Sequence, residues 1–221
     1  MNISMADDLK GKCCVITGGA GVLGTSMVTC LAQQGVKTAI IDLNIERALQ
    51  KAKEIASSTG GAVIGVGGNV LDKNSLAEAK EAVNAALGPI DILINAAGGN
   101  SPKATTAVET IEDKDLDHLD QTFFGLEMDA FRTVFDLNFI GTLLPTMVFA
   151  RDMVARKQGV VVNISSMNSY RPLTRIPAYS AAKASINNFT AWLSVHLARQ
   201  NIRVNAIAPG FFLTEQNKFL M

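Results

Sequence analysis

Three side chains in the second half of the sequence have the types and spacing needed to move a proton. Tyr179 and Lys183 lie four residues apart at the start of an apparent helix, so both side chains project from one helix face. A free phenol has a pKa near 10, and an ammonium group beside it favours the phenolate and lowers that pKa. Ser166 follows an apolar run thirteen residues earlier, at the kind of strand end where parallel sheets bind ligands. These three residues predict acid–base chemistry.

A glycine-rich segment near the N-terminus could hold a pyrophosphate. Residues 17–24 read Thr-Gly-Gly-Ala-Gly-Val-Leu-Gly, between an apolar run and a helical pattern. Glycines allow a tight turn and a close approach of the backbone to phosphate, whose charge a helix N-terminus attracts. Such loops also occur for packing alone, so the position of this one after the first expected strand supports the interpretation.

An acidic residue in the expected place favours one dinucleotide over another. Asp42 ends the second expected strand, eighteen residues after Gly24. A carboxylate there can accept hydrogen bonds from both hydroxyls of an adenosine ribose, and it would repel a 2′-phosphate. No arginine follows in Leu43-Asn44-Ile45. The sequence therefore predicts NAD as cofactor in preference to NADP. The alternative is an ordinary aspartate that caps the next helix.

The elements that must position these groups alternate along the whole chain. Strands are expected at 13–17, 38–41, 62–66, 90–94, 160–164 and 203–207, and helices at 24–34, 45–58, 73–87, 129–156 and 179–199. The strands are almost continuously apolar, as expected when helices cover both faces of a parallel sheet. This alternation predicts a doubly wound parallel sheet, an α/β fold of the Rossmann type, in a single domain over residues 1–221.

One segment interrupts the alternation. Residues 99–125 contain Pro102, two threonines at Thr105 and Thr106, and a Glu/Asp cluster from Glu109 to Asp120. A connection this long and irregular is usually functional or mobile.

Composition excludes several classes of function. Hydrophobic residues make up 48% of the chain, which is ample for a buried core, and twenty basic residues balance twenty acidic ones. No basic field favours nucleic acid or an anionic membrane. The three cysteines and two histidines lack metal-ligand spacing, so no metal site is expected. The polar N-terminus, the absence of any run of about 20 apolar residues and the unpaired cysteines predict a cytoplasmic protein.

Several motifs together resemble the short-chain dehydrogenase/reductase family. They are residues 17–24, Asn95-Ala96-Ala97-Gly98, Asn138, Ser166, Tyr179-x-x-x-Lys183 and Pro209-Gly210, and the match runs from about Gly11 to the C-terminus. The resemblance implies an NAD-dependent oxidoreductase in which Tyr179 exchanges a proton with the substrate oxygen. Ser166 would orient that oxygen, and Lys183 would also hold the nicotinamide ribose. Asn138 would support the lysine through a bound water and a local helix distortion.

The same resemblance implies a set of cofactor contacts. They are Gly18, Ala20, Gly21, Leu23, Asp42, Leu43, Asn69, Val70, Asn95, Ala96, Ala97, Tyr179, Lys183, Pro209, Gly210, Phe212 and Thr214. Four positions depart from the family pattern. Val22 replaces the second glycine of the loop, Asn69 stands where an aspartate is more usual, Ala96 where a second asparagine often lies, and Ser169 replaces a glycine often found after the serine. Only eleven residues follow Gly210. A C-terminal lid and a last strand are therefore expected to be missing from this sequence.

Within the family, residues 99–106, 137–142 and 209–217 look like those of bacterial D-mannonate oxidoreductases (fructuronate reductases) of the short-chain type. The implied reaction is reversible reduction of D-fructuronate to D-mannonate by NADH. A sugar acid needs a cation for its carboxylate, which Arg175 or Arg171 could supply unless both are plain surface charges. Its hydroxyls need polar partners, for which Asn100 and Asn168, with Ser169, are candidates.

Two other readings remain open. One is a dehydrogenase of another sugar, polyol or ketone, and the other is a non-catalytic NAD-binding sensor or scaffold. The intact set of Asn138, Ser166, Tyr179 and Lys183 argues against the second. The family resemblance also implies a homo-oligomer, a tetramer or dimer built partly on the helices at 129–156 and 179–199.

Overall fold

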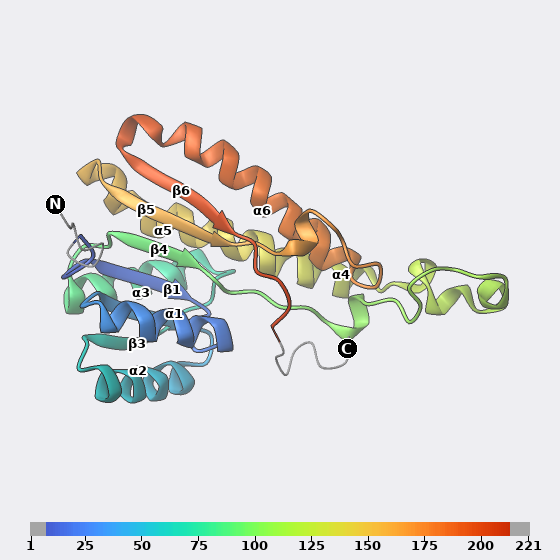
Figure 1. Ribbon diagram of the computed structural model, residues 1–221, viewed down its shortest axis with the longest axis horizontal. Helices are drawn as coiled ribbons and strands as arrows, with labels where there is room; N and C mark the ends of the chain where they lie inside the picture. Colours follow the sequence, from blue (N-terminus) through green and yellow to red (C-terminus); the bar gives the residue numbers. More distant parts are fainter. Residues whose placement is uncertain (1–7, 213–221) are drawn as a thin grey trace.

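The computed structural model describes residues 8–212, which form one parallel sheet between two helical layers (Figure 1). The strand order is β3-β2-β1-β4-β5-β6, and every pairing is parallel. The strands are β1 (Cys13–Thr17), β2 (Lys37–Asp42), β3 (Val63–Gly67), β4 (Ile92–Asn95), β5 (Gly159–Ile164) and β6 (Ile202–Ile207). This order is the doubly wound topology, so the predicted fold class is confirmed.

Two hydrophobic cores hold the helices on the two faces of the sheet. On one face lie α1 (Val22–Gln33) and α2 (Ile45–Thr59), whose buried residues pack with Ile16 and Ile40. On the other lie α3 (Lys73–Leu87), α5 (Gly141–Arg156) and α6 (Pro177–His196), packed around Phe149. Both cysteines of β1 are buried free thiols, and burial raises the pKa of Cys13 to about 11.

The long helix expected at 129–156 is not one uniform helix. It consists of α4 (Met128–Phe135), a π-helical turn at Asp136–Ile140 and α5. The side-chain amide of Asn138 donates to the Val134 carbonyl, four residues back, at 2.7 Å. This carbonyl is the one that the backbone N–H of residue 138 would use in a regular α-helix, so the turn widens here. The helix distortion implied by the family resemblance is confirmed.

The other elements differ from the sequence prediction only at their ends. β1 and α3 have the predicted bounds. α6 begins two residues earlier than expected, at Pro177, because proline suits the first helical position, where no N–H is needed. It ends earlier as well, at His196, and a separate 3-10 turn follows at Ala198–Gln200.

The helical stretch Met128–Arg156 is long and apolar. By length and composition alone it could cross a membrane, with a mean hydropathy of 1.4, although no such segment was expected. Half of that apolar window is buried inside the fold, where α5 packs on β4 and β5. Its apolar side chains therefore form the core on that face of the sheet.

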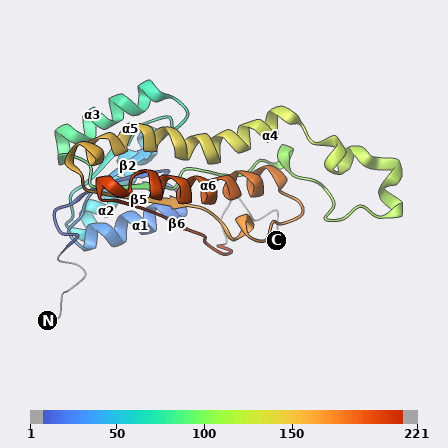
Figure 2. The ribbon, with the colours of Figure 1, turned by 90° about the horizontal axis from the view of Figure 1, so that it is seen from above.

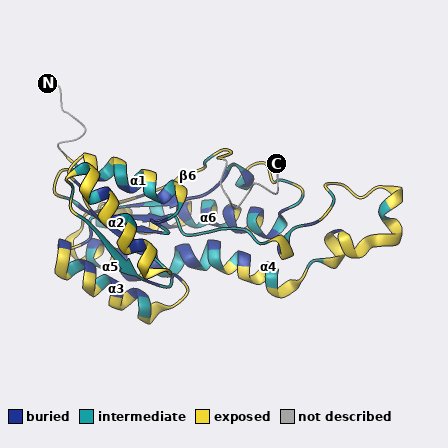
Figure 3. Ribbon diagram, turned by 90° about the horizontal axis from the view of Figure 1, so that it is seen from below, coloured by how far each residue is buried: buried dark blue, intermediate teal, exposed yellow. Residues whose placement is uncertain are grey.

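The irregular segment after β4 leaves the body of the molecule. Residues 107–126, here called the arm, extend beyond α4 and are almost entirely exposed (Figures 1 and 3). Short 3-10 helices at Asp113–Gln121 and Phe123–Gly125 give it an internal structure. The arm folds back on itself, because the Ala107 N–H donates to the Gln121 carbonyl at 3.0 Å.

Candidate active site

The structure brings Ser166, Tyr179 and Lys183 together beyond the carboxyl end of β5. Ser166 lies two residues after β5 and is buried, and its hydroxyl accepts the Asn168 N–H at 3.2 Å. The same hydroxyl is hydrogen-bonded to the Tyr179 phenol. Tyr179 and Lys183 occupy successive turns of α6, with the ammonium nitrogen 5.5 Å from the centre of the tyrosine ring.

Burial dominates the protonation of both side chains. It raises the pKa of Tyr179, and the hydrogen bond from Ser166 offsets part of that rise. It lowers the pKa of Lys183 to about 8. The prediction that Lys183 lowers the pKa of Tyr179 is wrong for this structure. The buried ammonium is itself less stable in its charged form, and it donates to the Ile164 carbonyl at 2.8 Å.

Asn138 joins this group through the chain that follows β4. Its amide nitrogen donates to the Gly99 carbonyl at 2.7 Å, and its oxygen accepts the Gly99 N–H at 3.3 Å. A Cβ at Gly98 would lie 2.5 Å from the Asn138 oxygen and 3.4 Å from the Lys183 nitrogen. Gly98 therefore allows the two side chains to approach the same point. The water-mediated support of Lys183 stays a prediction.

A chain of buried amides behind the site was missed by the sequence reasoning. The Asn95 amide donates to the Thr146 hydroxyl and to the Asn163 oxygen, both at 2.9 Å, and Asn163 donates to Thr190 at 2.9 Å. These bonds tie β4 and β5 to α5 and α6 in a fully buried layer. They occupy the amide nitrogen of Asn95, a predicted cofactor contact. An asparagine inside the apolar run 160–164 was the available signal, because buried polar groups need partners.

The loop after β1 fits a pyrophosphate. Gly18 has φ +64°, and a Cβ there would lie 2.8 Å from the Cα of Ala97, so the chains after β1 and β4 touch. A Cβ at Gly24 would collide with the Gly18 carbonyl. No side chain caps the start of α1 at Gly21, which leaves its first N–H groups available to an anion. Val22, the departure from the family loop, is 57% exposed.

Thr17 braces this loop and was also missed. Its hydroxyl accepts the N–H groups of Ala96 and Ala97, at 3.1 and 3.3 Å. These bonds hold the two strand ends together beneath the place where the loop turns. Ala20, also a predicted contact, is buried in the core under the loop, whereas Leu23 follows Val22 in the first turn of α1.

The residues predicted around the adenosine lie at the ends of β2 and β3. Asp42 is the last residue of β2, and its carboxylate accepts the Asn44 N–H at 3.1 Å, which leaves further acceptor capacity. Leu43 beside it is exposed. The Asn69 side chain accepts the Leu71 N–H at 2.9 Å. Val70 is buried and packs against Gly141, the first residue of α5, where a Cβ would lie 3.0 Å from the Val70 side chain.

Two predicted substrate residues have side-chain oxygens without a hydrogen-bond partner, and a third is bonded to the chain just before the arm. The side-chain oxygens of Asn168 and Asn100 are buried without a hydrogen-bond partner. The Arg175 Nε donates to the Thr106 carbonyl at 3.0 Å, and the Thr106 N–H donates to the Arg175 carbonyl at 2.9 Å. Arg175 therefore fixes the base of the arm to the segment that precedes Tyr179.

Ser169, another candidate partner for substrate hydroxyls, has an internal role in this structure. Its hydroxyl donates to the Ser166 carbonyl and accepts the Asn187 amide at 2.9 Å. Ser165 lies 3.1 Å from the same hydroxyl and also donates to the Lys183 carbonyl at 3.2 Å. These bonds tie the turn that carries Ser166 to α6.

The last predicted contacts follow β6. The Pro209 carbonyl accepts the Met167 N–H at 3.0 Å, so the chain after β6 lies beside the turn after β5. A Cβ at Gly210 would meet open space, and Phe212 is half exposed. Thr214 lies outside the described residues.

The amino-acid sequence of this chain is similar to those of known oxidoreductases. Residues 12–220 match the family model described as short chain dehydrogenase. The uncharacterized oxidoreductase UxuB of Bacillus subtilis is 47% identical over 99% of this chain and 77% of its own length. The 5-keto-D-gluconate 5-reductase of Escherichia coli is 34% identical over 96% of the chain and 76% of its own length.

A solved structure extends the similarity to three dimensions. It is a crystal structure with bound NAD of a Haemophilus influenzae protein provisionally described as a D-mannonate oxidoreductase. The two chains are 46% identical and superpose with a TM-score of 0.90, over 98% of this chain and 78% of the other.

Proposed function

This chain belongs to the short-chain dehydrogenase/reductase family, and we propose that it interconverts D-fructuronate and D-mannonate with NAD(H). The observation that carries the proposal is the hydrogen-bonded Ser166 and Tyr179 pair beside buried Lys183, with the unpartnered amide oxygen of Asn168 in the turn that carries Ser166. The H. influenzae relative that supports this substrate is provisionally described as a D-mannonate oxidoreductase, and its structure contains bound NAD.

The cofactor residues follow from the fit of the loop after β1. Gly18, Gly21 and the first N–H groups of α1 would hold the pyrophosphate, and Asp42 the adenosine ribose. When bound, the nicotinamide ring supplies the hydride for reduction or accepts it in oxidation. Lys183 would donate to the ribose next to that ring.

Tyr179 is the proposed proton donor. Its raised pKa keeps the phenol protonated near neutral pH, which is the state needed to give a proton to the oxygen of a carbonyl under reduction. Ser166 holds the phenol by a hydrogen bond and would bond the same substrate oxygen. Asn138 positions Lys183 through Gly98 and Gly99.

The polar atoms around this pair match a sugar acid. The amide oxygens of Asn100 and Asn168 are buried acceptors without partners, and the hydroxyls of a sugar are donors. Arg175 would place its guanidinium against the substrate carboxylate, since Nε alone is used by Thr106.

The direct test is to mix the protein with NADH and D-fructuronate and to measure NADH oxidation by the loss of its absorbance. NADPH in place of NADH is the control. Turnover that disappears in Tyr179→Phe, while NADH binding persists, supports both the reaction and the proton donor. Turnover only on 5-keto-D-gluconate or another ketone would reject D-fructuronate and keep the enzyme class. Binding of NADH without turnover on any carbonyl would favour a sensor.

The role of Arg175 can be tested against a neighbour. Arg175→Gln should raise KM for a sugar acid at least about tenfold, because a charge-assisted pair to the carboxylate is lost. KM for an uncharged ketone should stay the same. Arg171→Gln, at an exposed position, is the matched control. A change that appears at Arg171 and not at Arg175 would assign the cation to Arg171.

Assembly and location belong to the same proposal. The exposed side of α6 carries a stacked row of Phe189, Trp192 and His196, with centroid separations of 6.3 and 4.7 Å. Trp192 and Val195 are exposed large side chains. This row supports a homo-oligomer built on α5 and α6. The buried free thiols of β1 support a reducing, cytoplasmic location.

A further inference from the structure

The arm carries a charge opposite to that of the rest of the chain. It contains six acidic residues and one lysine, so its net charge is −5, and because the whole chain is neutral the remainder carries +5. Lys114 is paired within the arm, with Glu112 at 2.9 Å. Among the described residues, Asp113, Asp117 and Asp120 have no ion-pair partner.

The arm also exposes apolar side chains that a free surface segment rarely carries. Phe123 and Phe124 are 63% and 69% exposed and form an edge-to-face pair with centroids 5.6 Å apart. Leu116 on the preceding helix is exposed as well. The segment is nevertheless ordered by its own contacts: Ala107 is hydrogen-bonded to Gln121, and a Cβ at Gly125 would collide with the Asp120 carbonyl. An ordered, acidic and apolar projection is suited to docking on another surface.

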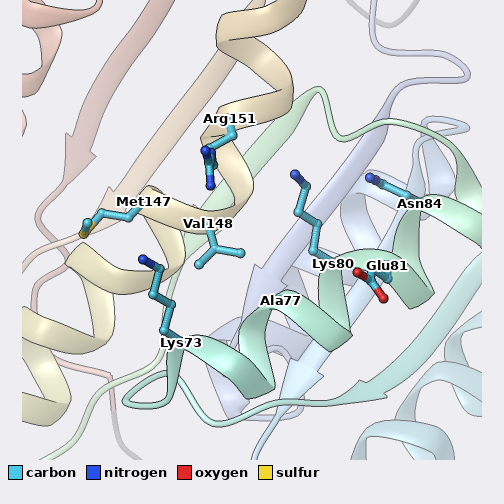
Figure 4. A pocket seen from close by; sticks show the side chains of 8 residues that line it. All are labelled: Lys73, Ala77, Lys80, Glu81, Asn84, Met147, Val148 and Arg151. Carbon is cyan, nitrogen blue, oxygen red and sulfur yellow. The ribbon is translucent and has the colours of Figure 1, made fainter.

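A basic pocket with an apolar floor lies between α3 and α5 (Figure 4). Its volume is about 570 Å³. Lys73, Lys80 and Arg151 lie around Val148, Met147 lies at one side, and Glu81 is the one acidic residue of the lining. Lys80 is paired with Asp152, whereas Lys73 and Arg151 have no partner among the described residues. The Met147 side chain is 51% exposed, and methionine sulfur makes favourable contacts with aromatic rings. The basic side chains of the pocket are thus complementary to the acidic arm, and its exposed methionine is complementary to the arm's two phenylalanines.

The arm cannot reach the pocket of its own chain. Figure 2 shows α3, beside α5, at one end of the molecule, and the arm extending from the other. A two-fold arrangement of two copies along this helical layer would bring each arm to the other copy's pocket, which closes the assembly. We propose that the acidic arm of one copy docks in the α3–α5 pocket of a second copy of this chain.

This contact would connect assembly to the candidate site. Ala104, at the base of the arm, is fully buried against Val134 and Ala178, next to Tyr179. Arg175 and Thr106 bond each other in both directions at the same place. A docked tip would therefore hold the segment that contributes Asn100 and Arg175 to the proposed substrate pocket. This interface is distinct from the aromatic row on α6 and independent of which substrate is used.

The first experiment is a zero-length carbodiimide cross-link on a mixture of unlabelled and ¹⁵N-labelled full chains. Coupling of arm carboxylates to the Lys73 or Lys80 amine, in peptides of mixed label, is the expected result. Cross-links confined to peptides of one label, or joining the arm only to other lysines, would overturn the proposal.

A charge exchange tests the pairing itself. An arm variant (Asp113→Lys, Asp117→Lys and Asp120→Lys), which reverses the arm's net charge, and a pocket variant (Lys73→Glu with Arg151→Glu) should each associate at least about tenfold more weakly, because like charges then face each other. An equimolar mixture should recover wild-type affinity, since each mixed dimer has two complementary contacts. Association is measured by sedimentation velocity.

The control reverses two exposed lysines away from both surfaces, Lys10→Glu with Lys53→Glu, and should leave association unchanged. Unaltered dissociation constants in the arm and pocket variants would sink the proposal. Weakening without recovery in the mixture would do the same, because it would show that the arm and the pocket do not pair with each other.

Discussion

At the scale of single residues, the site depends on groups whose burial changes their ordinary chemistry. Lys183 is a buried ammonium that donates to one carbonyl, and Tyr179 is a partly buried phenol hydrogen-bonded to one hydroxyl. Both shifts favour the neutral forms, as desolvation requires. In the cofactor-free protein, Tyr179 therefore keeps its proton. Lys183 loses its positive charge at about pH 8, the value to which burial lowers its pKa.

The lowered pKa of Lys183 makes stability depend on pH in a defined direction. Between about pH 8 and 10.5 the unfolded chain binds one more proton here than the folded chain, so the free energy of unfolding rises with pH. Relative to Lys183→Met, the cofactor-free wild type should gain on the order of 2 kcal/mol from pH 7.5 to 9.5. Urea unfolding of both chains measures this. A difference that is independent of pH would contradict the lowered pKa.

Asp42 should decide the cofactor. Asp42→Ala removes the carboxylate that would bond the ribose hydroxyls and repel a 2′-phosphate, so the ratio of kcat/KM for NADH to that for NADPH should fall by about tenfold or more. Asn44→Ala is the matched control, because it removes the cap of α2 and keeps the carboxylate. Equal cofactor ratios in Asp42→Ala and wild type would leave Asp42 with a structural role alone.

At the scale of elements, close contacts between neighbouring strand ends set the shape of the cofactor loop. The turn after β1 touches the chain after β4 at Gly18 and Ala97, and Thr17 bonds both strands. The π-helical turn between α4 and α5 places Asn138 against Gly98, in the chain that follows β4. The site is therefore formed by at least three elements that meet at one sheet edge.

Gly18→Ala tests this contact. The new Cβ would lie 2.8 Å from the Ala97 Cα, so the loop must shift, and the dissociation constant for NADH should rise at least about tenfold. Gly60→Ala is the matched control, because Gly60 has a similar φ of +70° and open space around its Cβ position. Isothermal titration of both variants gives the comparison. Equal NADH affinity in the two would show that the contact with Ala97 does not shape the site.

At the scale of the whole molecule, the body and the arm have separate sources of stability. The body is built on two cores around the sheet, whereas the arm is exposed and closed on itself. Just before the arm, the chain contacts the body through the buried Ala104 and through the bonds between Thr106 and Arg175.

Removal of the arm tip should therefore leave the fold intact. Replacing residues 109–120 by a four-residue Gly/Ser link should change the free energy of unfolding of the monomer by less than about 1 kcal/mol, as for other exposed segments. Chemical denaturation at low protein concentration measures it, with NADH affinity as a check on the site. A larger loss would mean that the arm stabilises the body directly.

The sequence by itself determined the sheet, its helices and the identity of the candidate residues. Apolar runs alternating with amphipathic stretches have few ways to bury their surface, and β1 and α3 were predicted with their bounds. The spacing of Tyr179 and Lys183 was enough to place both on one helix face, because local geometry fixes it.

Only the tertiary structure decided what surrounds those residues. The raised pKa of Tyr179, the Asn95–Asn163–Thr190 chain and the use of Ser169 to brace Ser166 depend on groups far apart in the sequence. The direction of the arm and its separation from the α3–α5 pocket arise in the same way. Burial and long-range hydrogen bonds are properties of the packed chain, so no local pattern of residues determines them.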